Sequence, residues 1–241
     1  MKTIFLTGHS GFIGLHLVKR LIELGYDVYE AQRNEVPMVN PLNLIEYDYV
    51  IHLAATTTLS TDFVPELFEN NVVYANKIMQ YSSRIIYASS TSASEYTNPY
   101  AGTKMYLEYL GEHHPNANGL RFFNVYRNGC KRGIIKRAID CAKSGEQMDI
   151  YGGDQVRDFI YIDDAVNAII DSLDSKEKII EIGTGIGRSI CGVIETIKEL
   201  TGASINTNYM PPSLNDMKVS VAEKGINGCI WLEEWLKKML S

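Results

Sequence analysis

Short runs of apolar residues alternate, through the first half of the chain, with longer segments in which apolar residues recur every three or four positions. The short runs predict buried strands, and the longer spacing predicts amphipathic helices. We expect strands at 3–7, 26–31, 48–55, 84–88 and 119–124, and helices at 13–24, 63–82 and 100–110. Strands that alternate with helices predict an α/β fold of the Rossmann type, which is a doubly wound parallel sheet with helices on both faces.

The pattern changes in the second half, where helical periodicity dominates. We expect helices at 133–143, 163–172, 189–200 and 231–240, with a short strand at 178–182. No low-complexity linker and no internal repeat separates the two halves. We therefore predict a Rossmann domain at residues 1–125 and a smaller α/β part at 126–241. The second part is expected to pack closely on the first and to be able to return strands to its sheet.

Three glycines follow the first predicted strand. Gly8, Gly11 and Gly14 fit a spacing variant of the dinucleotide-binding turn, in which glycines allow a tight turn, the approach of a pyrophosphate and close packing of helix on strand. The N–H groups and the positive dipole end of the next helix attract phosphate. The turn residues expected to contact a dinucleotide are Gly8, Ser10, Gly11, Phe12, Ile13 and Gly14.

The end of the second strand bears on the choice of dinucleotide. A carboxylate there binds the adenosine ribose of NAD, whereas a nearby arginine accommodates the 2′-phosphate of NADP. Gln32 and Arg33 slightly favour NADP. An exposed loop position for Arg33, together with the acidic Glu30, leaves NAD open.

Candidate chemistry lies in Tyr100-x-x-x-Lys104, which places two side chains on one helical face. A neighbouring ammonium stabilises phenolate, so we expect it to lower the pKa of Tyr100 and to make this residue a general base or acid. Ser90, at the end of the preceding strand, is placed to hydrogen-bond the same substrate oxygen. The glycine turn, Ala54, Ser90 and Asn124 all follow strands, and parallel sheets bind ligands at the carboxyl ends of their strands.

Composition limits the class of protein. The 241 residues carry a formal net charge of −6, which argues against a nucleic-acid partner. No apolar run approaches the roughly 20 residues of a membrane span, and no signal-peptide pattern opens the chain. The four cysteines lack metal-type or redox spacing, so we expect reduced thiols, no metal and a cytoplasmic protein.

These motifs together resemble the extended short-chain dehydrogenases/reductases, in particular the NAD-dependent epimerase/dehydratase group that modifies nucleotide sugars. The resemblance covers nearly the whole chain. Its blocks are 7–14, 48–55, Asn71-Val72, Ser89-Ser90, Tyr100-x-x-x-Lys104, 120–126, 150–152, 157–164 and 182–185.

The resemblance implies a role for each matching residue. Tyr100 is expected to exchange the proton of a sugar hydroxyl while hydride passes to or from the nicotinamide, Lys104 to hold the nicotinamide ribose, and Ser90 to orient the sugar. Residues 1–125 are expected to bind NAD or NADP, and 126–241 to bind substrate as a lid. Further cofactor contacts are expected at Leu53, Ala54, Ala55 and Asn71, and substrate contacts at Thr91, Asn124, Tyr151 and Arg157. For Arg157, an ion pair with Asp154 or Asp158 is the alternative.

The reaction is left open by departures from the family pattern. The segment between Ser90 and Tyr100 is short, and Thr91-Ser92 stands where 4,6-dehydratases carry Asp-Glu, which disfavours dehydration. We expect a nucleotide-sugar C4 epimerase, with an NADPH-dependent 4-keto-sugar reductase as the alternative and a non-catalytic dinucleotide-binding sensor as a third. The resemblance also implies a homodimer through the helices at 63–82 and 100–110.

Overall fold

The computed structural model describes residues 1–32, 41–57, 64–127, 130, 132–213, 216–226 and 228–240. The chain divides into two compact units. Unit 1 comprises Met1–Phe122 and Val166–Glu181, and unit 2 comprises Phe123–Ala165 and Ile182–Ser241. Residues 166–181, which lie beyond the expected domain boundary at residue 125, thus return to unit 1.

Unit 1 contains a six-stranded sheet with the order β2-β1-β3-β4-β5-β9. The strands from β2 to β5 in this order pair in parallel. The strands are β1 (Thr3–Thr7), β2 (Asp27–Ala31), β3 (Tyr49–His52), β4 (Ile85–Ser90), β5 (Ala117–Phe122) and β9 (Ile179–Ile182). The central strands are buried along nearly their whole length, as expected where helices cover both faces. The predicted doubly wound α/β fold is confirmed.

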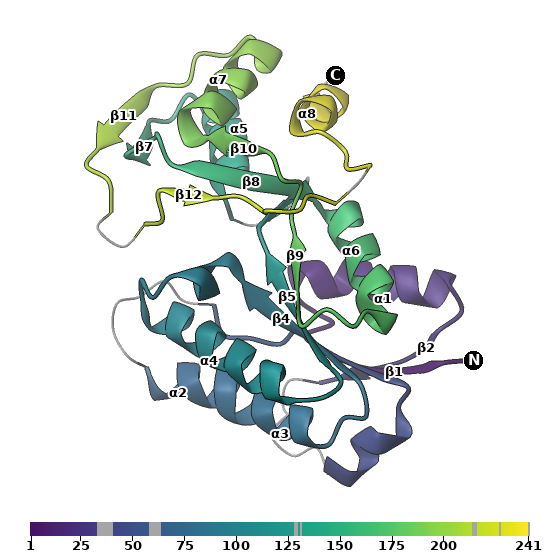
Figure 1. Ribbon diagram of the computed structural model, residues 1–241. Helices are drawn as coiled ribbons and strands as arrows, with labels where there is room; N and C mark the ends of the chain where they lie inside the picture. The colour runs from purple at the N-terminus through teal and green to yellow at the C-terminus, as the bar shows by residue number, and fades with distance from the viewer. Residues whose placement is uncertain are drawn as a thin grey trace. The chain divides into compact units, whose positions relative to one another are not determined.

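Helices lie on both sides of this sheet, with α3 and α4 together on one side and α1 and α6 on the other (Figure 1). Their bounds are α1 Phe12–Glu23, α2 Pro65–Phe68, α3 Tyr74–Gln80, α4 Pro99–His113 and α6 Ile162–Asp171. The helix expected at 63–82 is instead α2 and α3 joined by a π-helical segment, η3 (Glu69–Val73). Between β2 and β3 the described residues form only a short 3₁₀ helix, η2 (Pro41–Glu46), which fits the short gap in the sequence. Two further 3₁₀ helices are η4 (Thr91–Ser94) and η5 (Ser172–Asp174).

The side chain of Tyr87 leaves room only for glycine at two positions in unit 1. This fully buried side chain of β4 lies between α4 and β5. A Cβ atom at Gly111 of α4 would lie 2.1 Å from the Tyr87 hydroxyl, and one at Gly119 of β5 would lie 2.6 Å from it. Glycine at both positions therefore lets α4 pack closely on the sheet.

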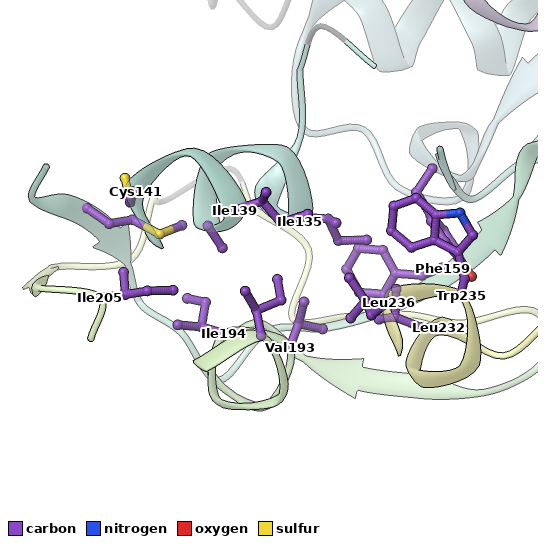
Figure 2. Packing of buried hydrophobic residues seen from close by; sticks show 14 of the residues in the cluster. Ile135, Ile139, Cys141, Phe159, Val193, Ile194, Ile205, Leu232, Trp235 and Leu236 are labelled. Carbon is purple, nitrogen blue, oxygen red and sulfur yellow. The ribbon is translucent and has the colours of Figure 1, made fainter. Parts of the chain in front are cut away.

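Unit 2 is built from short strands and three helices. Its strands are β6 (Asn124–Tyr126), β7 (Met148–Tyr151), β8 (Val156–Tyr161), β10 (Gly187–Ser189), β11 (Thr207–Met210) and β12 (Val219–Ser220). β8 pairs with β6, β10 and β12, and β7 pairs with β11. The helices α5 (Ile134–Ser144), α7 (Ile190–Thr201) and α8 (Leu232–Leu240) enclose an apolar core with Phe159 of β8, which Figure 2 shows.

One buried carboxylate organises the loops of unit 2. Asp158 of β8 is fully buried and accepts hydrogen bonds from the Thr184 N–H (2.9 Å) and hydroxyl (2.6 Å), the Gly185 N–H (2.8 Å) and the Ala222 N–H (3.2 Å). These donors compensate the cost of burying its charge. Asp158 thereby joins the loop after β9 to the segment after β12.

Among the described residues, no helix combines the length and the apolarity needed to cross a bilayer.

Candidate active site

The glycine turn of unit 1 is packed against the end of β3. Gly8 follows β1 with φ +75°, a conformation that favours glycine. A Cβ atom at Gly8 would lie 2.6 Å from the Ala54 nitrogen and 2.8 Å from the Leu53 carbonyl carbon. A Cβ atom at Gly14 would lie 2.1 Å from the Gly8 carbonyl oxygen. The structure therefore brings together the turn and the Leu53-Ala54 segment that the sequence predicted separately.

The N-terminus of α1 is suited to an anion. Its N-cap is Gly11, and within the described residues no side chain caps it. Ser10 and Gly11 are exposed, and Phe12 and Ile13 are half-buried. The first N–H groups of a helix have no intrahelical acceptor, so a pyrophosphate can satisfy them. The geometry fits the predicted dinucleotide.

The structure describes only part of the segment at the carboxyl end of β2, where the sequence bears on the choice between NAD and NADP. Gln32 is exposed, and its side-chain amide lies 3.5 Å from the Glu30 carbonyl oxygen. Arg33, on which the preference for NADP depended, lies outside the described residues. The Glu30 carboxylate lies 3.9 Å from Nε2 of His9 in the glycine turn.

Asn71 holds the segment that follows β3. It is buried in η3, where its Oδ1 accepts from the Thr56 N–H (2.7 Å) and its Nδ2 donates to the Thr56 carbonyl (2.9 Å) and to the Thr103 hydroxyl of α4 (3.2 Å). Asn71 thus fixes the backbone just after Ala55. Direct contact of Asn71 and Ala55 with a cofactor stays a prediction.

Ser90, Tyr100 and Lys104 are brought together by β4 and α4. Asn98 caps α4 by accepting from the Ala101 N–H (2.9 Å), and Pro99 opens the helix, so Tyr100 falls in the first turn. Ser90 ends β4. The Lys104 ammonium donates to the Ala88 carbonyl (2.7 Å) and lies 5.8 Å from the centre of the Tyr100 ring.

The electrostatics of this cluster differ from the prediction. Burial raises the pKa of Tyr100, and a hydrogen bond with Ser90 acts in the opposite direction. The expectation of a lowered pKa for Tyr100 was wrong for the chain alone, because the desolvation of this phenol outweighs the effects that lower its pKa. Burial also lowers the pKa of Lys104 to about 8, against the opposing effect of Glu108.

A buried histidine adjoins the cluster. Nδ1 of His52 lies 2.7 Å from the Thr7 hydroxyl oxygen, which also accepts from the Ala54 N–H (3.3 Å). Nε2 of His52 is buried without a hydrogen-bond partner among the described residues. Burial, with a smaller effect of the Lys104 charge, lowers the pKa of His52 to about 3. The sequence motif contained His52 but did not reveal this state.

Unit 2 contains a cavity of about 370 Å³. It is lined by Asn124 and Arg157, which the sequence assigned to substrate, and by residues that sequence reasoning missed, among them Phe123, Cys130, Arg132 and Phe159. Guanidinium groups with aromatic and aliphatic side chains suit a phosphorylated ligand that carries an apolar part.

The two substrate candidates at this cavity are held by protein contacts. Nδ2 of Asn124 donates to the Asp158 carbonyl (3.1 Å). Arg157 forms an ion pair with Asp216, whose other carboxylate oxygen accepts from Gln155 (3.0 Å). Asp216, rather than Asp154 or Asp158, is therefore the acidic partner of Arg157.

The remaining substrate candidates lie elsewhere. Tyr151 ends β7, is exposed and does not line the cavity. Thr91 begins η4 in unit 1, one residue after Ser90. Contacts of Tyr151 and Thr91 with substrate stay predictions.

A model of the NAD dependent epimerase/dehydratase family matches residues 4–183. The chain belongs to this family. The match extends from β1 through the glycine turn and the Ser90–Tyr100–Lys104 cluster to the loop that binds Asp158. The resemblance read from the sequence is confirmed, and membership of this family places the chain among enzymes.

Named relatives show the range of reactions in the family. CDP-abequose synthase of Salmonella muenchen is 25% identical, and the alignment covers 100% of this chain and 97% of the relative. ADP-L-glycero-D-manno-heptose-6-epimerase of Brachyspira hyodysenteriae is 30% identical over 88% of this chain and 85% of the relative. Among solved structures, MoeE5 in complex with UDP-glucose and NAD has a TM-score of 0.84 at 27% identity, covering 97% and 96% of the two chains.

The buried His52 predicts a pH dependence of stability. Because its folded pKa is about 3 and an unfolded histidine has a pKa of about 6.5, the unfolded state binds the proton more readily between these values. The contribution of neutral His52 to the free energy of unfolding is complete above pH 6.5 and is lost as the pH falls towards 3. Urea unfolding at pH 6.5 and 5 should show that wild type loses about 2 kcal/mol more than His52→Asn. The exposed His113→Asn variant should behave as wild type, and equal losses in His52→Asn and wild type would contradict this account.

Proposed function

We propose that the protein is an NAD-dependent nucleotide-sugar epimerase that inverts a carbon, C4 in the first instance, by oxidation and reduction. One observation carries this proposal: unit 1 contains both parts of such a site. The first part is the helix N-terminus after the glycine turn, which is suited to an anion. The second is the cluster of Ser90, Tyr100 and Lys104 that β4 and α4 form. Family membership and the heptose-6-epimerase among the named relatives support it.

NAD is the cofactor that the comparisons favour. The family is described as NAD dependent, and two MoeE5 complexes at 26–27% identity contain NAD. When bound, NAD accepts and returns a hydride and carries a positive nicotinamide. The N–H groups of α1 would hold the pyrophosphate, and Lys104 would hold the nicotinamide ribose.

The side chains of unit 1 would move one proton. Tyr100 Oη would take the proton of the sugar hydroxyl as the C–H hydride leaves for bound NAD, and it would return that proton when the hydride comes back on the other face of the sugar. Ser90 orients the hydroxyl. Because burial raises the pKa of Tyr100, this step needs positive charge close to the phenol, which protonated Lys104 and the nicotinamide supply together.

Nucleotide recognition is assigned to unit 2. We propose that Arg157 and Asn124 bind the diphosphate of the substrate and that Phe123 and Phe159 contact its apolar surfaces. MoeE5 was solved with UDP-glucose and with UDP-glucuronic acid, which supports a nucleotide sugar as ligand. The two-part assignment of cofactor to residues 1–125 and substrate to 126–241 is part of this proposal.

A reductase is the second candidate. dTDP-4-dehydro-6-deoxyglucose reductase of Escherichia coli is 23% identical over 98% of this chain, and Gln32 does not supply the carboxylate typical of NAD enzymes. Such an enzyme would consume its cofactor, whereas an epimerase returns it unchanged.

Turnover separates these candidates. With purified protein, NAD and a panel of UDP-sugars, we expect NMR to detect the C4 epimer of one sugar with no net change in NADH. Tyr100→Phe should lower kcat at least about a hundredfold, because general acid–base catalysis contributes at least that much. Tyr106→Phe, on the exposed side of α4, is the matched control. Stoichiometric oxidation of NADPH with a keto-sugar would instead establish the reductase.

Close packing at Gly14 predicts the behaviour of the cofactor site. In Gly14→Ala the new methyl group would collide with the Gly8 carbonyl oxygen and move the turn. Moving the turn would misplace the N–H groups that face the pyrophosphate, and because each 1.4 kcal/mol of lost binding free energy is tenfold in Kd, we expect the Kd for NAD to rise roughly tenfold or more. Calorimetric titration measures it. Leu15→Ala, exposed on the same helix, should bind as wild type. Unchanged affinity in Gly14→Ala would refute the assigned cofactor site.

We also propose a homodimer and a cytoplasmic location. The four cysteines, all within the described residues, are free thiols, which suits a reducing compartment. Exposed apolar side chains gather on α2, η3 and α4, where Phe68 and Tyr106 lie 6.4 Å apart and Tyr106 stacks on Tyr109 at 6.1 Å. An exposed aromatic cluster is typical of an interface.

The dimer has its own test. Tyr106→Glu would place a charge in the aromatic cluster, so we expect sedimentation equilibrium to show a monomer where wild type is a dimer. Tyr209→Glu, at a tyrosine of unit 2 that is 56% exposed against 47% for Tyr106, should stay dimeric. A monomeric wild type would rule out the proposed assembly.

A further inference from the structure

Behind Lys104, on the same face of α4, lies a buried carboxylate that the proposed mechanism does not use. Glu108 stands four residues after Lys104 and is 9% exposed, while Lys104 is 2% exposed. Residues four apart on a helix are neighbours. The two side chains form bonds to successive residues of β4, because Lys104 donates to the Ala88 carbonyl (2.7 Å) and Glu108 Oε1 accepts from the Ser89 hydroxyl (2.6 Å). Ser90, the third residue of this run, bonds Tyr100.

The carboxylate is fixed from the next strand as well. Arg121 of β5 pairs with Ser89 in the strand register and donates from Nε to Glu108 Oε1 (2.9 Å) and from Nη2 to Oε2 (2.7 Å). Such a two-point contact sets both the position and the orientation of the carboxylate. Glu108 therefore cannot turn away from Lys104 without breaking three hydrogen bonds.

The charges of this cluster depend on one another. Lys104 and Arg121 are both positive. Glu108 forms an ion pair with Arg121 and stands four residues after Lys104 on the same face of α4. The other titratable groups that face the cluster are Tyr100 of α4, His52 of β3, Tyr87 of β4, Glu112 of α4 and Glu181 of β9. His52, with a pKa of about 3, is neutral at neutral pH. Glu108 is the carboxylate whose charge raises the pKa of Lys104 against its desolvation.

We propose that Glu108, fixed by Ser89 and Arg121, is a positioning residue that keeps the Lys104 ammonium charged and bonded to β4 beside Tyr100. The catalytic part of this inference rests on the proposed function, while the electrostatic part concerns the chain alone. Without the carboxylate, desolvation would drive Lys104 towards the neutral amine, and Tyr100 would lose the cation that supports its phenolate.

The direct test measures Lys104 in the cofactor-free protein. In protein labelled with ¹³C-lysine, the Cε resonance missing from Lys104→Met is titrated with pH. Glu108→Gln, which removes the charge and keeps the shape, should lower the pKa of Lys104 so that its acid dissociation constant rises about tenfold or more. Glu108→Asp keeps the charge one methylene further away and should give a smaller shift in the same direction. Glu112→Gln is the matched control on the same helix and should leave Lys104 unchanged.

Measurements of enzyme activity then test whether the charge on Lys104 supports catalysis by Tyr100. The alkaline limb of the kcat–pH profile should move to lower pH in Glu108→Gln by the shift seen in the titration, and Glu108→Asp should restore most of it. If Glu108→Gln does not fold, as judged by its NMR spectrum, Glu108→Asp carries the measurement. An unchanged Lys104 titration in a folded variant overturns the inference, even if the enzyme is an epimerase. A shifted titration without turnover of any nucleotide sugar refutes the proposed function and leaves the electrostatic role intact.

Discussion

The burial of one ammonium group constrains where α4 lies in unit 1. A lysine charge withdrawn from water costs several kcal/mol unless it is paired and hydrogen-bonded. Lys104 is nearly inaccessible to solvent. The helix α4 must therefore lie where the Ala88 carbonyl can accept a hydrogen bond from the ammonium and where Glu108 can offset its charge. Glycine at 111 lets the helix come close enough. The position of Tyr100 follows, since it lies one turn before Lys104 on the same helix.

Unit 2 buries a charge as well, and there three backbone N–H groups and one hydroxyl stabilise it instead of a counter-charge. Asp158 is fully buried, and four donors from two distant segments surround it. The preceding residue in the chain, Arg157, lines the cavity and forms an ion pair with Asp216. In each unit a buried charge thus fixes the element that carries a candidate functional residue.

Much of this could be predicted from sequence because local rules decide it. The glycine turn, the apolar strands and the Asn98-Pro99 start of α4 each depend on a few adjacent residues. Contacts between distant positions could not be predicted in the same way. Asp216 lies 59 residues from Arg157, and Glu108 meets Ser89 and Arg121 only once α4 is packed on the sheet. The π-helical segment also escaped prediction, because periodicity alone does not register one extra residue in a turn.

The wrong expectation about Tyr100 has a consequence for the chemistry. The i, i+4 spacing correctly placed Lys104 near the phenol, but spacing says nothing of the desolvation that raises the pKa of Tyr100. In the free chain Tyr100 is therefore a phenol at neutral pH, ready to donate a proton but not to accept one. In the proposed mechanism, accepting a proton from a sugar requires more positive charge at the site, which an oxidised nicotinamide would bring and a reduced one would not. That mechanism would therefore couple the protonation state of Tyr100 to the oxidation state of the dinucleotide, as a reversible hydride transfer needs.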